Sequence, residues 1–297
     1  MVSEIPPRDN IIGIVFNPVT NSGRSIDRMR HVLQLLDSKG VEYVYRETEF
    51  EGGAKTVAEE LCQTCDVIVA AGGDGTVFEA VNGALGKDPK FMILPFGSGN
   101  DIARSTGVNG LSDEELVDVL IAGKTRGFDY LISNGTVSMV YMSMGIVVNI
   151  IRDFKDPNNA RKSYNSTVLA SVRRSRPRRY HIRTPMMDRD ISADFISAQN
   201  IVTAGGGMVV TADAVDDDMM MDLVIIEHRN VVRKYLNVIA LNRGKVDKQP
   251  NAIVERTKWA EITPLDGVEW YSLDGELMTT EGIRVDICEK QMRMIVP

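Results

Sequence analysis

The residues best suited to chemistry lie in one stretch, Val67 to Gly83, which reads VIVAAGGDGTVFEAVNG. Its first five residues are apolar and rich in β-branched side chains, which is typical of a strand buried on both faces. A glycine-rich turn follows, and the apolar residues after it are spaced for a helix. A strand, a glycine turn and a helix in this order place backbone N–H groups at the carboxyl end of a sheet. That arrangement favours anion binding, most often of phosphate.

Asp74 narrows the chemistry of this turn, which spans Gly72–Thr76. The three glycines let a phosphate approach the backbone without meeting a Cβ atom. A carboxylate repels phosphate unless a metal ion lies between them, and Mg²⁺ bridges carboxylates, waters and phosphate oxygens. Thr76 is a candidate to cap the helix or to contact a phosphate. The alternative is a tight turn of an ordinary doubly wound sheet, but the full string GGDGTVFEAVNG is more specific than that.

Two further loops carry the same kinds of residue. The sequence reads NPVTNSGR at the end of a predicted strand that starts at Ile11, and PFGSGNDIAR after the predicted strand Phe91–Leu94. The ends of parallel strands meet at one edge of a sheet, which is where open α/β sheets bind ligands. We therefore expect the three polar loops to lie together.

These motifs resemble those of the diacylglycerol kinase catalytic domain family, which includes bacterial diacylglycerol kinases, sphingosine kinases and ceramide kinases. GGDGTVFEAVNG resembles the family signature, and NPVTNSGR resembles its N-P-x-S-G-[KR] pattern. LPFGSGNDIARSTGV resembles its P-x-G-T-x-N-D-x-A-R segment, with a serine that keeps the hydroxyl of the usual threonine. The pair Asn100-Asp101 is also typical of a helix N-cap. The resemblance implies an ATP site lined by Asn17, Gly72, Gly73, Gly75, Thr76, Gly97, Ser98 and Asn100.

The resemblance also implies the catalytic residues. Asp74 would hold Mg²⁺ on the triphosphate, directly or through water. In the turn SLDGE, Asp274 would accept the proton of the acceptor hydroxyl, and Glu276 would lie near the metal or position Asp274. General-base assistance of this kind contributes about 10²–10⁴ in rate. From the residues alone, D-G is a standard hairpin turn.

Two more aspartates are implied metal ligands. Asp129 ends an R-x-x-D segment and would help to link Asp74 to the metal through water; a strand-end salt bridge is the alternative. Asp217 lies in TADAVDDDMMMD, which resembles a loop that holds a second, structural Mg²⁺ in some bacterial members of the family. Asp218 replaces the usual glycine of that loop. A plain acidic surface loop is the alternative.

The N-terminal part of the chain must position most of these residues, and it alternates strands with helices. This alternation predicts an α/β domain with a doubly wound parallel sheet. Ser112 and Glu115 form a predicted capping box at the start of the last helix of this part. The predicted strands are Ile11–Phe16, Val41–Arg46, Val67–Ala71 and Phe91–Leu94, and predicted helices end near Ser38, Leu61 and Ala122.

From Thr125 onward the apolar runs become shorter and more numerous, which predicts a mainly antiparallel β-sandwich as a second domain. We place the boundary near Gly127, with an ATP-binding domain over 1–127 and a lipid-substrate domain over 128–297. The extreme C-terminus is a candidate to pack back on the first domain. The predicted strands are Thr125–Ile132, Thr136–Met144, Tyr180–Thr184, Ile191–Thr203, Leu223–Glu227, Trp259–Thr263, Val268–Leu273, Ile283–Cys288 and Met292–Val296.

The composition narrows the class of protein. The chain has 297 residues and a net charge of −7, which argues against general nucleic-acid binding. No apolar run is long enough to span a bilayer, and MVSEIPPRDN does not have the pattern of a signal peptide, so we expect a cytoplasmic protein. Cys62 and Cys65 lack the further ligands that a zinc site requires, so reduced thiols are expected. Dimers occur among bacterial members of the family, so a homodimer is expected by analogy.

One dense basic cluster interrupts this acidic chain. It is either a solvated connecting face or a surface that docks on anionic lipid, at about 1 kcal/mol per basic residue. We favour docking, because a lipid substrate requires contact with a membrane. The cluster contains Arg173, Arg174, Arg176, Arg178 and Arg179.

Together these features predict a lipid kinase that uses ATP and Mg²⁺, with diacylglycerol as the favoured acceptor, acting in phospholipid biosynthesis. The chain has neither a Walker A string nor the H-R-D and D-F-G motifs of protein kinases. NAD kinase, which also uses GGDGT, is the alternative enzyme. A catalytically silent lipid-binding or regulatory relative is the alternative of another class.

Overall fold

The structure is a computed structural model, and it describes residues 11–156 and 164–297. The chain forms two compact units, which are described separately here. The first contains the chain up to Phe128 together with Met292–Pro297, and the second contains Asp129–Gln291. The first ten residues of the predicted N-terminal domain lie outside the described residues.

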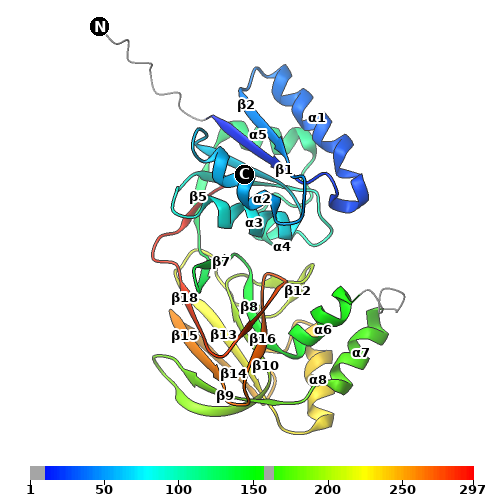
Figure 1. The fold of residues 1–297 in the computed structure, drawn as a ribbon, viewed down its shortest axis with the longest axis vertical. Helices are drawn as coiled ribbons and strands as arrows, with labels where there is room; N and C mark the ends of the chain where they lie inside the picture. The colour runs from blue at the N-terminus through cyan, green and yellow to red at the C-terminus, as the bar shows by residue number, and fades with distance from the viewer. Residues whose placement is uncertain (1–10, 157–163) are drawn as a thin grey trace. The chain divides into compact units, whose positions relative to one another are not determined.

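The N-terminal unit is built on one six-stranded sheet with the order β2-β1-β3-β4-β19-β5 (Figure 1). Strands β1 to β4 and β19 run parallel, and β5 pairs antiparallel with β19. The chain moves from β1 outward to β2 and then returns past β1 to β3, so the crossover helices change face there. The strands are β1 Ile12–Phe16, β2 Tyr43–Glu47, β3 Val67–Gly72, β4 Lys90–Pro95, β5 Thr125–Phe128 and β19 Met292–Ile295.

Helices cover this sheet in two pairs, because α1 packs with α5 and α2 packs with α3. The predicted capping box is present: the side chain of Ser112 accepts the N–H of Glu115, and the side chain of Glu115 accepts the N–H of Ser112. The helices are η1 Thr20–Gly23, α1 Ser25–Ser38, α2 Gly53–Leu61, α3 Asp74–Ala84, α4 Asp101–Ser105 and α5 Asp113–Ala122.

The C-terminal unit is mainly antiparallel, as predicted, and its strands form one connected eleven-stranded sheet. The long strand β10 joins its parts: the first half of β10 pairs with β9, and the second half pairs with both β8 and β13. The strands are β6 Leu131–Ser133, β7 Thr136–Ser138, β8 Tyr141–Gly145, β9 Arg178–Arg183, β10 Asp188–Gln199, β13 Met221–Glu227, β14 Ala252–Thr257, β15 Trp259–Pro264, β16 Glu269–Leu273, β17 Glu276–Thr280 and β18 Ile283–Ile287; a separate small hairpin contains β11 Thr203–Ala204 and β12 Met208–Val209.

Three helices gather beside this sheet: α6 Ile146–Lys155, α7 Tyr164–Arg174 and α8 Val231–Asn242 (Figure 1). Their contact is apolar, since Ile146, Val168 and Val172 form a buried cluster to which α8 adds Tyr235 and Val238. Within the described residues, the structure contains no helix long and apolar enough to cross a membrane.

Several predicted strands need correction. The predicted strand Thr125–Ile132 is two strands in different sheets, and Thr136–Met144 is broken after Ser138 by the turn into β8. The C-terminal strand Met292–Ile295 belongs to the sheet of the N-terminal unit. The prediction missed β14, β17 and the helix α6.

Candidate functional site

The three polar loops of the N-terminal unit lie side by side. Strand β3 has β1 and β4 as its neighbours, so the loops that follow these strands leave one edge of the sheet together. The side chain of Asn17 donates to Oγ1 of Thr76 at 3.1 Å, which ties the loop after β1 to the loop after β3. A Cβ atom on Gly97 would lie 2.5 Å from the Cα of Gly73. The loops after β3 and β4 therefore touch backbone to backbone, which only glycine permits here.

Helix α3 begins in the middle of the glycine motif, at Asp74, with Gly73 as its N-cap. Among the described residues, no side chain caps this helix. A Cβ added to Gly75 would meet nothing within 4 Å, so the backbone of this exposed residue is open to a ligand. An uncapped helix N-terminus offers unsatisfied N–H groups and a favourable dipole for an anion. The residues present therefore fit a phosphate group.

Thr76 does not cap α3, which corrects one of its two predicted roles. It lies inside the helix, is buried, and its hydroxyl accepts the hydrogen bond from Asn17. A Cβ on Gly72 would lie 2.4 Å from Oγ1 of Thr76. Gly72 is therefore required by packing against Thr76, while Gly75 is the glycine of this motif that faces open space.

Asp74 points at a second helix. Its Oδ1 accepts the backbone N–H of Asp101 at 2.9 Å, at the start of α4. Burial raises the pKa of Asp74, and the carboxylate of Asp101 raises it further. Asp101 is itself buried and pairs with Arg104 at 3.0 Å. Within the described residues, His, Cys, Asp and Glu side chains form no group of three or more that could hold a metal.

Asn100 shapes the loop before α4. It has a left-handed backbone with φ of 55°, and its side chain donates to the carbonyl of Gly97 at 2.8 Å. Asn100 occupies the predicted N-cap position of α4, but its side chain makes no capping hydrogen bond to that helix within the described residues. Ser98, which stands where the family usually has threonine, is exposed.

The part of GGDGTVFEAVNG that follows Thr76 holds two helices together, which the sequence analysis did not predict. The carboxylate of Glu79 accepts the N–H groups of Gly52 and Ala54 at 3.1 and 3.0 Å and so caps α2. A Cβ on Gly83 would lie 2.1 Å from the carbonyl oxygen of Lys55, so α2 and α3 cross in close contact there. Half of the motif is therefore explained by helix packing.

Asp274 lies at the tip of the β16–β17 hairpin in the C-terminal unit. Asp274 and Gly275 have φ of 49° and 95°, as a two-residue type I′ turn requires, so the predicted hairpin is present. The carboxylate of Asp274 accepts four hydrogen bonds from the turn between β7 and β8. The donors are the hydroxyl of Ser138 at 2.6 Å and the N–H groups of Met139 at 2.7 Å, Val140 at 3.0 Å and Tyr141 at 2.9 Å.

Burial raises the pKa of Asp274 to about 6, although its four donors oppose this rise. Three donors converge on Oδ1 and one on Oδ2, so Oδ2 keeps more free acceptor capacity. A carboxylate with a pKa near 6 is mostly ionised at neutral pH and is still basic enough to accept a proton. That combination suits a general base.

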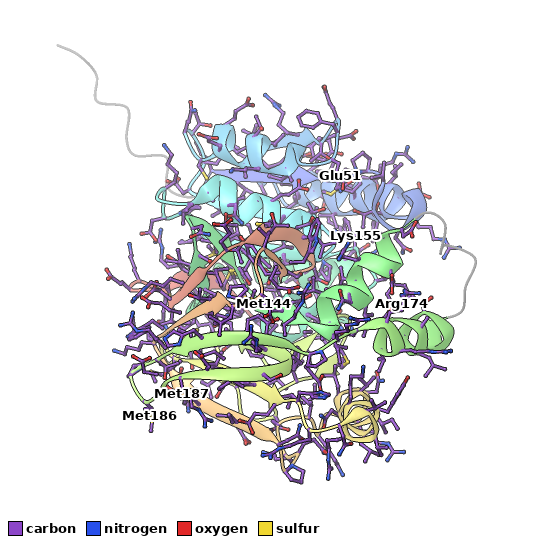
Figure 2. The ribbon with its side chains drawn as sticks, turned by 60° about the horizontal axis from the view of Figure 1, so that its bottom comes forward. Glu51, Met144, Lys155, Arg174, Met186 and Met187 are labelled. Atoms are coloured by element: carbon purple, nitrogen blue, oxygen red, sulfur yellow. The ribbon has the colours of Figure 1, made fainter. Side chains whose placement is uncertain are left out.

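Glu276 follows this turn and is bound to the helical part of the unit. Its Oε2 lies 3.2 Å from Nζ of Lys155, near the end of α6, and both side chains are half-exposed. Lys155 lies on α6 and Arg174 on the neighbouring helix α7 (Figure 2). The ion pair links the hairpin of Asp274 to α6.

The other two predicted metal ligands lie close together in the C-terminal unit. Asp129 is fully buried, and its N–H donates to the carbonyl of Asp216 at 2.7 Å. Its carboxylate accepts the N–H of Met219 at 2.6 Å and the side chain of Gln291 at 2.8 Å. Asp129 thus anchors the loop that contains Asp217, whereas Asp74 belongs to the other unit.

The loop around Asp217 is held by its neighbour. Asp217 is exposed, and Asp218 forms an ion pair with Arg256 of β14. The left-handed backbone of this loop is at Met219, with φ of 59°.

An apolar cavity of about 160 Å³ lies next to the hairpin of Asp274. Its walls come from α6, α8, β8, β10 and the β11–β12 hairpin, and include Ile150, Phe195 and Leu241. Tyr141 connects the two features: its side chain lines the cavity, and its N–H donates to Asp274. Asp274 itself does not line the cavity, but it is hydrogen-bonded to a residue that does.

The predicted basic cluster is largely neutralised. Arg174 pairs with Asp153, Arg178 with Glu269 at 2.9 Å, and Arg179 with Asp266 at 2.7 Å. These pairs lie around a polar hollow at the α6–α7 side of the unit. Arg173 and Arg176 are exposed and carry no ion pair in the described part of the chain.

Comparison with known families finds two matches that follow one another along the chain. The model for the diacylglycerol kinase catalytic domain matches residues 12–132. The model for the YegS C-terminal NAD kinase beta sandwich-like domain matches residues 138–296, more than half of the chain.

Two curated relatives match over nearly the whole length. The chain is 26% identical over 278 residues to a protein of Enterobacter sp. (strain 638) named "Probable lipid kinase YegS-like", with 91% of each chain covered. A protein of Citrobacter koseri with the same name is 26% identical over 288 residues, covering 93% of this chain and 94% of the relative.

Solved structures share the fold. A structure from Bacillus anthracis str. Sterne, described as a diacylglycerol kinase, superposes with a TM-score of 0.75 at 17% identity and covers 97% of both chains. An NAD kinase from Archaeoglobus fulgidus, solved in complex with ATP, superposes with a TM-score of 0.55 at 14% identity, covering 96% of this chain and 93% of that one. The two family models, matched one after the other along the chain, show that it belongs to the family with a diacylglycerol kinase catalytic domain followed by a YegS-type C-terminal domain.

Proposed function

We propose that the protein is an ATP-dependent lipid kinase that transfers the γ-phosphate of ATP to the hydroxyl of a lipid. One observation carries the proposal: Asp274, a partly buried carboxylate with a pKa of about 6, accepts the N–H of Tyr141, and Tyr141 lines an apolar cavity. The names of the curated relatives support the same class of reaction.

In the proposed reaction, Oδ2 of Asp274 takes the proton of the lipid hydroxyl. The lipid oxygen bonds to the γ-phosphorus as the bond from that phosphorus to ADP breaks and ADP leaves. Four donors and a type I′ turn fix the carboxylate, so little reorganisation is needed when the proton arrives. Phosphoryl transfer depends mainly on positioning and on neutralising charge. Asp274 would supply the positioning and the proton acceptor on the lipid side.

The N-terminal unit would bind the phosphoryl donor. The open N-terminus of α3 and the backbone of Gly75 would donate hydrogen bonds to the phosphates. Mg²⁺, when bound, would neutralise charge on the triphosphate, and Asp74 is the carboxylate of the glycine turn that would hold it. Asp101 would share that role through its position beside Asp74. The predicted role of Asp129 toward the metal held by Asp74 stays a proposal, and so does the role of Asp217 toward a second, structural Mg²⁺.

The cavity supports a lipid as the acceptor. Its lining is mainly aliphatic and aromatic, which would favour an acyl chain and disfavour the charged, polar nucleotide that an NAD kinase must accept. We propose diacylglycerol as the acceptor, because it offers a single hydroxyl on an apolar body.

Contact with a membrane would deliver such an acceptor. Large apolar side chains are exposed on the helices next to the cavity, including Leu169 of α7 and Val232, Leu236 and Ile239 of α8. With most of the predicted arginine cluster paired to carboxylates, we propose that these apolar residues contribute more to membrane contact than charge does.

The test is transfer of labelled phosphate from γ-labelled ATP to a panel of lipids in mixed micelles, with NAD as a parallel acceptor. We expect a phosphorylated lipid and unlabelled NAD. Label on NAD would make the protein an NAD kinase-like enzyme. Binding of ATP and lipid without any transfer would make it a catalytically silent relative.

A further inference from the structure

The cavity beside Asp274 has a polar floor. Tyr141 and Ser143 of β8 lie directly opposite Gln199 and Ser197 of β10 in the antiparallel ladder. Residues opposite one another project from the same face of a sheet. All four side chains line the cavity, so its floor is polar while its walls are apolar.

In two of these side chains, one polar atom lacks a hydrogen-bond partner among the described residues. The hydroxyl of Ser197 donates to the carbonyl of Met142 at 3.0 Å and accepts the amide N–H of Gln199 at 2.5 Å. Within residues 11–156 and 164–297, Oε1 of Gln199 and Oγ of Ser143 have no hydrogen-bond partner, although each residue is only 1% exposed. Buried polar atoms without partners are costly and need an explanation.

A ligand would supply the missing partners. Gln199 offers its free Oε1 as an acceptor, while one N–H of its amide is bound to Ser197, and Ser143 offers a hydroxyl that can donate. The matching ligand therefore carries a hydroxyl donor and a carbonyl acceptor close together. An acylglycerol has both, in its glycerol hydroxyl and its ester groups.

The charge of the lining restricts the ligand further. Among the described residues that line the cavity, no side chain is charged. An ammonium or phosphate group in this space would lose its hydration without gaining a counter-ion. The cavity therefore selects against sphingoid bases and phosphorylated lipids.

We propose that Ser143 and Gln199 recognise the ester and hydroxyl groups of an uncharged acylglycerol whose acyl chain fills the cavity between α6 and α8. This inference rests on the proposed lipid kinase function, because it names the residues that select the acceptor. Ser143 and Gln199 are positioning residues in this scheme, and the proton still goes to Asp274.

The test measures binding without nucleotide, so that it does not depend on catalysis. Equilibrium dialysis would compare 1,2-dioctanoylglycerol with hexadecanol, which has a hydroxyl but no ester, and with sphingosine. The variants are Ser143→Ala and Gln199→Met. Thr211→Val is the matched control, because Thr211 also has a buried hydroxyl without a partner but does not line the cavity.

We expect the wild-type protein to bind dioctanoylglycerol more tightly than hexadecanol or sphingosine. Each cavity variant should lose about tenfold in affinity for dioctanoylglycerol, since one hydrogen bond to the ligand is removed. Affinity for hexadecanol should fall less in Ser143→Ala than in Gln199→Met. Hexadecanol has the hydroxyl that Gln199 would bind but lacks the ester that Ser143 would bind. The control should bind all three lipids as the wild type does.

Thermal unfolding of the ligand-free variants separates recognition from a structural role. Because Ser143 has no partner, Ser143→Ala should leave the melting temperature unchanged or raise it. Unchanged affinity of both variants for dioctanoylglycerol, or equal losses for all three lipids, would overturn the inference. Selective binding without phosphate transfer would uphold it and refute the kinase function. Phosphate transfer that does not depend on Ser143 or Gln199 would uphold the kinase function and refute the role of these two residues in acceptor recognition.

Discussion

The carboxylates of Asp74 and Asp274 are positioned in contrasting ways. Asp74 belongs to a local motif, and its Oδ1 accepts the N–H of Asp101, only 27 residues away. Asp274 accepts its four hydrogen bonds from residues 133 to 136 positions earlier in the chain. The first is set by a short string of glycines beside an open helix end, and the second by the register of a large antiparallel sheet. A phosphate site can thus be encoded locally, whereas a rigid base at a lipid cavity needs long-range pairing.

Apart from the loss of the base Asp274, the largest effect should come from removing the charge of Asp74. Asp74→Asn keeps an oxygen that can accept the N–H of Asp101, so the fold should survive. Loss of Mg²⁺ binding should lower kcat by about 10²–10³-fold, because a metal contributes several kcal/mol to such reactions. The assay is phosphate transfer at saturating lipid over a range of Mg²⁺ concentrations. Binding of dioctanoylglycerol is the control and should not change. Full activity without the carboxylate would remove Asp74 from the proposed metal site.

The pH dependence of kcat/KM should distinguish Asp274 from Asp74, because Asp274 must be ionised to accept a proton. With its pKa raised to about 6, kcat/KM should be level above about pH 7 and fall about tenfold per unit well below pH 6. The folded state binds this proton more tightly than the unfolded chain, where the pKa is about 4. The contribution of Asp274 to the free energy of unfolding should therefore decrease as the pH rises from about 4 to about 6. Asp274→Asn should flatten this stability profile, and a wild-type rate profile without a fall near pH 6 would argue against the base.

Two glycines of the phosphate loops should behave differently, although both were predicted to line the ATP site. Gly97→Ala should destabilise the protein by about 1–3 kcal/mol, because its Cβ would meet the backbone of Gly73 at 2.5 Å. Gly75→Ala should leave stability unchanged or slightly raised, because nothing lies within 4 Å, yet it should weaken ATP binding. Thermal unfolding and ATP titration of both variants check this pair. Equal losses of stability would show that Gly75 is a packing residue as well.

The smallest effect should come from Glu79, which caps α2 and lies within the signature string. Glu79→Ala should cost about 1 kcal/mol of stability, the usual value of a lost helix cap. Affinity for ATP should remain near that of the wild type. Urea unfolding with a parallel ATP titration measures both quantities. A large loss of ATP affinity with no loss of stability would show that Glu79 contributes to ATP binding rather than to helix packing.

Most of the N-terminal unit could be predicted from the sequence, because its information is local. Strand ends, glycine turns and the capping box at Ser112 each depend on a few adjacent residues, and the structure contains them. What was missed there is contact between elements, such as the close approach of Gly83 to α2. No sequence pattern distinguishes that glycine from one that binds phosphate.

The C-terminal unit was predicted less well, and the reason is physical. The segment of α6 reads IVVNIIRDFK, and its β-branched residues favour a strand, so packing against α7 and the sheet overrides local propensity. The D-G turn predicted a hairpin but gave no sign of Ser138, which comes from a strand far along the chain. The polar floor of Ser143 and Gln199 depends on strand register, which the sequence alone does not specify.

The central claim assigns the phosphoryl donor to the N-terminal unit and the proton acceptor to Asp274. The most direct test compares the wild type with Asp274→Asn, which suits the left-handed backbone at this position and retains an oxygen for the donors. Steady-state transfer of labelled phosphate from ATP to dioctanoylglycerol would be measured together with ATP affinity and thermal unfolding. We predict that kcat falls by about 10²–10⁴-fold while ATP affinity stays within about twofold. A folded variant with wild-type kcat, or a loss of rate fully explained by weaker ATP binding, would contradict the account.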